Sequence, residues 1–298
     1  MPTRPEGVDL RGVVFDCIAE TETVGYVLDA LDAERGGWVI TSNLDHLLRA
    51  GRDSEFRGML DEADLVVADG MPLVWASQLQ GTPLPERVAG SSLVWTMTAE
   101  AAKRGRSVFL LGGDEGTAEK AGRILTETYP GLKIVGTHCP PFGFEADDAK
   151  MKVIFEVLRN SQADLVYVAL GSPKQERLIR RLRGGDAEPA SEGVGEVLPG
   201  AWWMGVGISL SYICREVKPA PAWMKRSGLE WVFRLVQEPK RLVKRYLVDG
   251  IPFAVVLLCS SAWRRVAGRR GKWVRPAGAG GVAVREMITE VQPHGGGR

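Results

Sequence analysis

The amino-acid sequence predicts an α/β protein in which a mostly parallel sheet carries helices on both faces. Three features support this fold class. Short apolar runs recur over residues 1–217, helix-like stretches separate most of them, and several runs end in glycines or small polar residues. Strands that alternate with helices form parallel sheets, because each connection must cross back over the sheet before the next strand begins.

The predicted strands are apolar runs rich in β-branched and aromatic residues, as is typical of strands covered on both faces. They are Val13–Phe15, Trp38–Thr41, Leu65–Ala68, Val108–Leu111, Lys133–Val135, Leu165–Leu170 and Trp202–Val206. The helix-like stretches between them include Ser92–Lys103, Gly116–Thr128, Ala149–Asn160 and Lys174–Leu182. These elements predict a Rossmann-like domain at residues 1–217, with an exposed acidic and glycine-rich loop at 184–200.

After Lys218 the alternation stops, and aromatic residues are interleaved with lysines and arginines. We interpret residues 218–275 as a basic, aromatic helical appendage and residues 276–298 as a disordered tail. The apolar run Ile251–Trp263 is shorter than the roughly 20 residues that span a bilayer, and cations flank it on both sides. Such a segment is expected to lie on an anionic membrane surface. The alternative is a core helix with a solvated basic face.

The composition indicates a globular protein, with 45% hydrophobic and 25% charged residues. A formal net charge of +1 gives no overall attraction to nucleic acid. Four cysteines without metal-ligand spacing favour a reducing compartment, and the polar start of the chain favours the cytoplasm. The motifs of P-loop NTPases, serine hydrolases and zinc hydrolases do not occur in the sequence, and no metal site is predicted.

Polar side chains stand where two of the predicted strands end. Thr41 and Asn43 close the strand at 38–41, and Ser172 and Gln175 follow the strand at 165–170. Ligands of open α/β sheets bind at the carboxyl ends of the strands, so these side chains are candidates to hold a sugar or a phosphate. The alternative is that they only cap the helices that follow.

A glycine turn follows the strand at 108–111. Gly112 and Gly113 do not match the G-x-G-x-x-G pattern, and no acidic residue follows the strand at 133–135. A nicotinamide dinucleotide is therefore disfavoured. A nucleotide diphosphate against the following helix N-terminus is still consistent with the pattern.

Two charged residues have the chemistry of a transfer site. Asp69 ends the strand Leu65–Ala68, where a carboxylate whose pKa is raised by burial could act as a general base, or could simply be an N-cap. Arg87 lies in the proline-rich loop 83–90 with Glu86 as its one nearby acid in the sequence. The guanidinium fork of Arg87 matches paired oxygens, as in a diphosphate.

Taken together, the motifs resemble the WecG/TagA/CpsF family of bacterial glycosyltransferases, from about Asp9 to about Phe253. They are TSN at 41–43, ADGM at 68–71, GTPLPERVAGSSL at 81–93, LLGG with YPGLKIVGTH, ALGSPKQE at 169–176, and APAWMKRSGLEWVFRLVQEPKRLVKRYL. The resemblance implies a UDP-sugar donor, such as UDP-linked N-acetylmannosamine or its uronic acid, and a polyprenyl-diphosphate-linked acceptor. It further implies inversion without a metal or cofactor, at the cytoplasmic face of the membrane.

Carried over residue by residue, the resemblance makes Asp69 the general base and places Thr41, Asn43, Arg87 and Gln175 in the substrate pocket. It also implies that the C-terminal helices close the site and touch the membrane, and it leaves a homo-oligomer open. The chain departs from the family where members usually read G-V-G-G-A-F-D, because residues 205–211 read GVGISLS. Ile208 and Ser211 predict a narrower pocket wall that lacks one negative charge.

Two other functions compete with transfer. The changes at Ile208 and Ser211 also suit a non-catalytic nucleotide-sugar-binding membrane scaffold. A dinucleotide-dependent oxidoreductase acting on a nucleotide sugar would need NAD(H), against which the glycine spacing argues.

Overall fold

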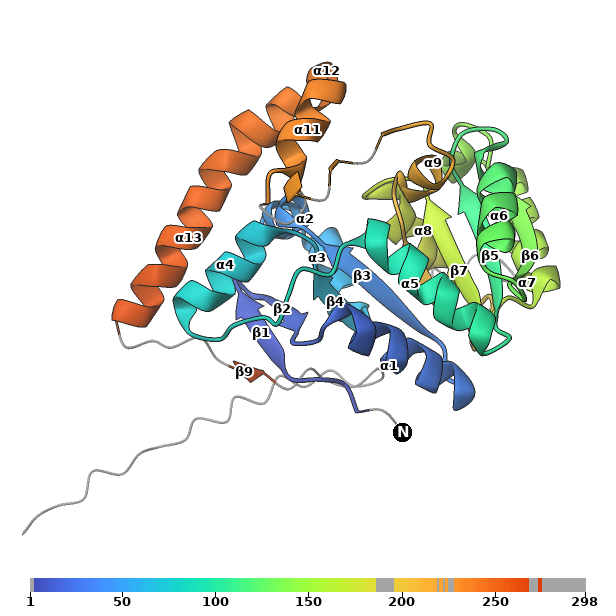
Figure 1. Ribbon diagram of the computed structural model, residues 1–298, viewed down its shortest axis with the longest axis horizontal. Coiled ribbons are helices and arrows are strands. Elements are labelled where there is room, and N and C mark those ends of the chain that lie inside the picture. Colours follow the sequence, from blue (N-terminus) through green and yellow to red (C-terminus); the bar gives the residue numbers. More distant parts are fainter. Residues whose placement is uncertain are drawn as a thin grey trace, which may run out of the picture.

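The main sheet of the computed structural model has six parallel strands in the order β4-β3-β8-β7-β5-β6 (Figure 1). The structure describes residues 3–185, 196–218, 220–221, 223–224, 228–267 and 273–274. The strands are β3 (Gly37–Ser42), β4 (Leu65–Ala68), β5 (Ser107–Gly112), β6 (Lys133–His138), β7 (Leu165–Ala169) and β8 (Trp202–Gly205). The predicted α/β fold class is confirmed, and this sheet is parallel throughout.

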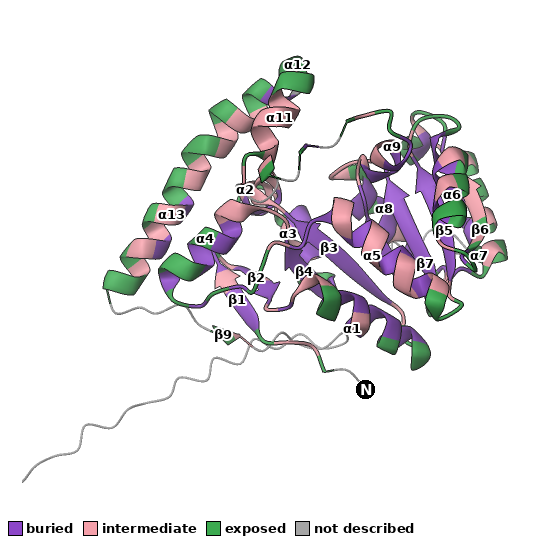
Figure 2. Ribbon diagram, in the orientation of Figure 1, coloured by how far each residue is buried: buried purple, intermediate pink, exposed green. Residues whose placement is uncertain are grey.

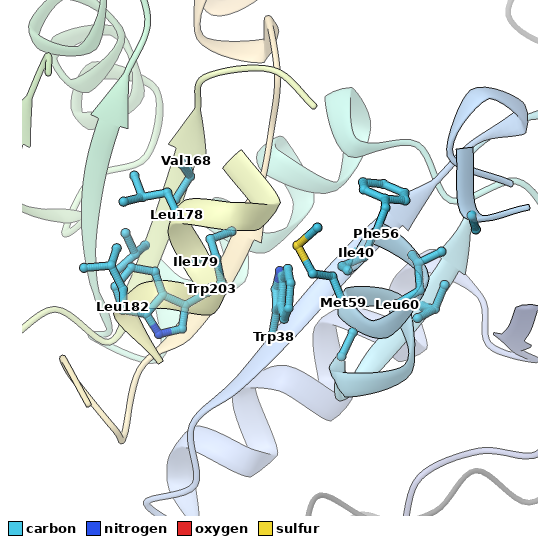
Figure 3. Close-up of a cluster of buried hydrophobic side chains, with 14 of the residues drawn as sticks. Trp38, Ile40, Phe56, Met59, Leu60, Val168, Leu178, Ile179, Leu182 and Trp203 are labelled. Atoms are coloured by element: carbon cyan, nitrogen blue, oxygen red, sulfur yellow. The ribbon is translucent and has the colours of Figure 1, made fainter. Parts of the chain in front are cut away.

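Helices cover both faces of the sheet, because successive strand residues point to opposite sides. One face packs on α1 (Glu20–Asp32), α5 (Gly90–Lys103), α6 (Thr117–Thr128) and α9 (Ser209–Ile213). The other packs on α2 (Leu44–Ala50), α3 (Ser54–Glu62), α4 (Met71–Gln80), α7 (Asp148–Ser161) and α8 (Lys174–Leu182), with a short 3₁₀ turn at Phe144–Ala146. In Figure 3 the side chains of Trp38 and Trp203, from neighbouring strands, form one cluster with those of α3 and α8.

The first predicted strand lies outside the main sheet. β2 (Val13–Asp16) pairs antiparallel with β1 (Gly7–Leu10), and β9 (Trp273–Val274) pairs with the other side of β1. The cause is the tight turn at Arg11 and Gly12, both with positive φ, because a two-residue turn joins only antiparallel strands. The Asp16 carboxylate accepts a hydrogen bond from the Val66 amide at 2.7 Å and so ties the hairpin to β4.

The C-terminal helices stand against the β4 side of the molecule. They are α11 (Glu230–Gln237), α12 (Pro239–Val243), a π-helical segment η2 (Lys244–Gly250) and α13 (Ile251–Val266). α13 packs against α4 (Figure 1). Exposed residues recur along α13, whereas β3, β4, β5, β7 and β8 of the sheet are buried and the edge strand β6 is partly exposed (Figure 2). The division into residues 1–217 and 218–275 stays a prediction.

The expectation that the apolar C-terminal run is too short to span a bilayer is wrong on length. η2 and α13 form one helix of 23 residues, Lys244–Val266, with a mean hydropathy of 1.6. The helix begins before the apolar run and ends after it, so by length and composition it could cross a membrane. The predicted tail at 276–298 and most of the predicted loop at 184–200 lie outside the described residues.

Candidate active site

The predicted site residues gather at the carboxyl edge of the sheet. Because the strands are parallel and in register, Asn43, Asp69, Gly113 and Ser172 follow the ends of four different strands at this one edge. Gly207 follows the end of β8, which lies between β3 and β7. The edge is therefore formed by segments far apart in the sequence, as in the ligand crevices of open α/β sheets.

Asp69 is fixed directly after β4. Its amide donates to the carbonyl of Ser42 at 2.8 Å, and its carboxylate accepts from the Gly90 amide at 3.4 Å. Gly70, not Asp69, is the N-cap of α4, so the alternative role of Asp69 as a helix cap is wrong. Burial raises the pKa of Asp69 to about 6. A carboxylate with such a pKa is suited to accept a proton near neutral pH.

Arg87 lies beside Asp69 because its loop runs back along β4, where the Val88 amide donates to the Ala68 carbonyl at 2.9 Å. The guanidinium of Arg87 donates from Nη1 to Oε2 of Glu230 at 2.8 Å, which joins the core to α11. Burial lowers the pKa of Arg87, but Asp69 and Glu230 outweigh it and raise the pKa overall. Arg87 therefore stays charged between two acidic side chains.

Arg234 brings a second guanidinium to the same region, one turn of α11 after Glu230. Its charge acts on Asp69 and on the hydroxyls of Tyr212 and Tyr246. The Nε atom of Arg234 is buried and has no hydrogen-bond partner among the described residues. A buried donor without an acceptor is costly, so this atom is suited to meet an anionic ligand or a water.

Thr41 and Asn43 take different roles at the end of β3. Thr41 is buried, and a Cβ on Gly90 would lie 2.9 Å from its Oγ1, so the start of α5 sits directly on this threonine. Asn43 caps α2, accepting through Oδ1 from the amides of Asp45 at 3.0 Å and His46 at 3.2 Å. Asn43 therefore caps the following helix, as the alternative prediction had it. Its Nδ2 group donates to no described residue.

Gln175 is buried, and both ends of its amide have protein partners. Nε2 donates to Glu176 at 2.8 Å, and Oε1 accepts from the Gly207 amide at 3.1 Å. A Cβ at Gly205 would lie 2.5 Å from Nε2, so the side chain needs the glycine beside it. Gln175 therefore anchors the loop after β8, and direct contact with a ligand would require exchange of one of these partners.

The glycine turn after β5 is required by its geometry. Gly112 has φ +98°, and a Cβ there would lie 2.6 Å from the carbonyl oxygen of Ala169. Gly113 donates its amide to the same carbonyl at 2.8 Å, so this N–H is not free for a phosphate. Ser172, across the edge after β7, has a buried Oγ without a partner in the described part of the chain. The structure brings these residues to one edge and leaves their contact with a substrate as a prediction.

A comparison with known protein families gives a match over most of the chain. The model of the family described as "Glycosyl transferase WecG/TagA/CpsF family" matches residues 8–267. The chain belongs to this family. It is therefore a glycosyltransferase, and the sequence-based resemblance is confirmed. A curated relative from Bacillus spizizenii, named N-acetylglucosaminyldiphosphoundecaprenol N-acetyl-beta-D-mannosaminyltransferase, is 28% identical over 211 residues, which cover 71% of this chain and 75% of the relative.

The two departures from the usual motif of the WecG/TagA/CpsF family lie at the start of α9. Ile208 is the N-cap residue, with φ −86°, a conformation that does not require glycine. Ser211 lies within α9, and its carbonyl accepts from the Glu216 amide at 3.0 Å. The backbone is thus unstrained at both positions, and any effect on the pocket comes from the side chains alone.

Glu230 and Arg234 of this glycosyltransferase were not identified as site residues from the sequence. Both lie inside the quoted C-terminal motif, but the contact between Glu230 and Arg87 joins positions 143 residues apart. A contact between positions so far apart leaves no periodic pattern in the local sequence. Two further buried groups, Glu176 and His46, were also missed, and each has a ring or carboxylate atom without a partner among the described residues.

One cysteine lies at this edge, where the Sγ of Cys139 donates to the carbonyl of Gly113 at 3.3 Å. All four cysteines are free thiols. Within the described residues, no group of three or more His, Cys, Asp or Glu side chains is arranged to hold a metal ion.

Proposed function

We propose that the protein transfers N-acetylmannosamine, or a related hexose or uronic acid, from a UDP-sugar to a polyprenyl-diphosphate-linked sugar, with inversion and without a metal. The observation that carries the proposal is the carboxylate of Asp69, whose raised pKa of about 6 and neighbour Arg87 suit a base beside a diphosphate. The name of the Bacillus spizizenii relative supports both the sugar and the lipid-linked acceptor.

In the proposed reaction Asp69 takes the proton from the acceptor hydroxyl as its oxygen attacks the anomeric carbon. A new glycosidic C–O bond forms while the bond from the anomeric carbon to the diphosphate breaks, and UDP leaves with the electron pair. Attack from the side opposite the leaving group inverts the anomeric configuration. Arg87 and Arg234 neutralise charge that develops on the departing diphosphate, which lowers the barrier because both are already positioned.

We further propose that the enzyme binds peripherally at the cytoplasmic face of the membrane through its C-terminal helices. Large apolar side chains are exposed there, among them Val248, Val255, Val256 and Trp263. Basic residues such as Lys244 and Arg265 stand at either end of the long helix, an arrangement that favours anionic lipid surfaces. A lipid-linked acceptor would reach the carboxyl edge from this side, where α11 lies over Asp69 and Arg87.

A second candidate function is a non-catalytic scaffold that binds nucleotide sugars at the membrane. The side chains of Ile208 and Ser211, which differ from the family pattern, are the observation that favours it. This candidate predicts UDP binding without sugar transfer to any lipid acceptor.

The deciding experiment is a transfer assay with a panel of UDP-sugars and a short-chain polyprenyl-diphosphate-GlcNAc acceptor. Transfer from UDP-N-acetylmannosamine, with an inverted linkage in the product, is the expected result. UDP binding measured by calorimetry, combined with no product from any donor, would instead establish the scaffold. Activity that persists in excess EDTA is expected, and its loss would contradict the metal-independent chemistry.

A further inference from the structure

The ion pair between Arg87 and Glu230 differs from the other contacts that join the core to the C-terminal helices. Its side chains are only 19% and 17% exposed. Three other such pairs have longer distances and more exposed arginines: Arg245–Asp45 at 3.1 Å, Arg264–Asp9 at 3.5 Å and Arg52–Asp249 at 3.8 Å. Exposed pairs are screened and contribute little, so among these four Arg87–Glu230 has the strongest electrostatic coupling.

Glu230 is the residue that orients the Arg87 guanidinium. The acid next to Arg87 in the sequence, Glu86, accepts from the Glu20 amide at 2.7 Å and is engaged there. The hydrogen bond to Glu230 is the one that Arg87 makes within the described part of the chain. It uses one nitrogen of a planar fork, so the other donors keep a fixed direction toward a ligand.

Burial is the main cause of the raised pKa of Asp69, and both members of this ion pair act on that carboxylate as well. Arg87, from the loop after α4, and Arg234, from α11, favour the charged form of Asp69, whereas Glu230 disfavours it. The Gly90 amide, at the start of α5, also favours the charged form. Glu20 of α1 acts on Arg87. Among the described residues of the C-terminal helices, Glu230 is the acidic side chain that acts on both the proposed base Asp69 and Arg87, the proposed diphosphate ligand residue.

We propose that Glu230 is a positioning residue of the transfer site: from α11 its carboxylate holds the Arg87 guanidinium beside Asp69. The proposal rests on the proposed function, in which Arg87 binds the diphosphate. It assigns to the appendage a specific role in the site that is separate from membrane binding.

The test compares the full-length protein with its Glu230→Gln variant, using a water-soluble short-chain acceptor so that membrane binding is not required. The substitution keeps the shape of the side chain and removes its charge. We expect UDP affinity by calorimetry to fall about tenfold, because Arg87 is no longer held by a charged partner. We also expect KM for the donor to rise by a similar factor. The acid limb of kcat/KM should move to lower pH, because a negative charge near Asp69 has been removed.

The matched control is Asp9→Asn, which neutralises the Arg264–Asp9 pair between α13 and the core. The Asp9 Oδ1 that accepts from the Gly12 amide at 3.1 Å is kept in asparagine, so the hairpin turn is preserved. We expect wild-type UDP affinity and an unchanged pH profile in this control. Equal losses in both variants, with no movement of the acid limb, would reduce Glu230 to a docking contact and overturn the proposal.

Two further outcomes separate this inference from the proposed function. Wild-type UDP affinity and turnover in Glu230→Gln, or tighter UDP binding, would overturn the positioning role while the transferase function stands. A wild-type protein that neither binds UDP nor transfers sugar would overturn both. Circular dichroism and thermal unfolding of each variant confirm that the fold is intact before the affinities are compared.

Discussion

The sheet and the C-terminal helices differ in how far their tryptophan side chains are exposed to solvent. Trp38, Trp202 and Trp203 lie in neighbouring strands and are each 1% exposed, whereas Trp263 of α13 is 71% exposed. In the sheet, tryptophan burial stabilises the fold. An aromatic side chain left in water is instead typical of a binding surface. The difference supports the proposal that the C-terminal helices, unlike the sheet, contact a membrane surface.

The candidate active site lies where these two regions meet. Asp69 and Arg87 come from the core, and Glu230 and Arg234 come from α11. A site at this seam would connect a water-soluble donor, held by the sheet edge, with an acceptor held at the membrane.

The first prediction concerns the pH dependence of transfer. If Asp69 is the base, its pKa of about 6 sets the acid limb, because only the deprotonated carboxylate accepts a proton. We expect kcat/KM to fall about tenfold for each pH unit below that value. Steady-state rates between pH 4.5 and 8, with circular dichroism at each pH, measure it. A flat profile over this range would remove Asp69 from the role.

The second prediction concerns the exposed apolar face of α13. The double variant Val255→Glu, Val256→Glu should lower binding to anionic phosphatidylglycerol vesicles by at least about tenfold, because each buried valine contributes roughly 1.5–3 kcal/mol. Vesicle co-sedimentation measures it. The matched control is the double variant Val135→Glu, Val153→Glu, whose valines lie in β6 and α7, away from the C-terminal helices. Val135 and Val153 are 40% and 47% exposed, similar to Val255 and Val256 at 54% and 50%. Equal losses of vesicle binding in both double variants would show that binding does not depend specifically on the valines of α13.

The third prediction concerns close packing in the core. Gly112→Ala should destabilise the fold by about 1–3 kcal/mol or more, because the new Cβ meets the Ala169 carbonyl at 2.6 Å in a left-handed conformation. Gly116→Ala is the control, with φ +79° but no atom within 4 Å of its Cβ. Thermal unfolding should show a larger fall in Tm for Gly112→Ala. Similar falls in Tm would show that the left-handed backbone conformation, rather than the contact with the Ala169 carbonyl, causes most of the destabilisation.

The fourth prediction concerns the buried imidazole of His46. Burial lowers the pKa of His46 to about 4, so between pH 6.5 and 4 the unfolded chain binds a proton that the folded chain does not. Stability therefore falls as the pH drops through this window, by at most about 1.4 kcal/mol per unit. Asp69 acts in the opposite sense, since its raised pKa makes the folded state bind protons below about 6.

These opposing contributions can be separated in the Asp69→Asn background. There, His46→Leu should flatten the dependence of Tm on pH between 6.5 and 4. Differential scanning calorimetry of the single and double variants measures the change in slope. An unchanged slope would show that His46 is not held neutral by burial.

Much of the core could be predicted from the sequence because its signals are local. β4 (Leu65–Ala68) and α8 (Lys174–Leu182) have the predicted bounds. The apolar run of β4 and the amphipathic pattern of α8 can each be recognised from the residues of that element alone. The antiparallel placement of Val13–Phe15 could not be predicted, because it depends on a turn at Arg11 and Gly12 that carries a positive φ at a non-glycine residue.

The site was predictable only on its core side. Asp69 and Arg87 follow recognisable strand ends and loops, and the structure places them together. Their partners on α11 were not predictable, because an ion pair across 143 residues leaves no trace in periodicity or spacing. The capping role of Asn43 and the anchoring of Gly207 by Gln175 were likewise open until the backbone was placed.

The most direct test of the account is one transfer assay that compares the intact chain with its Asp69→Asn variant, using UDP-N-acetylmannosamine and the short-chain polyprenyl-diphosphate-GlcNAc acceptor. We expect product from the intact chain and a loss of about 10²- to 10⁴-fold in the variant. The Tm of the variant should be unchanged or higher, because a buried carboxylate has been neutralised. Near-normal turnover by Asp69→Asn would show that Asp69 is not the general base.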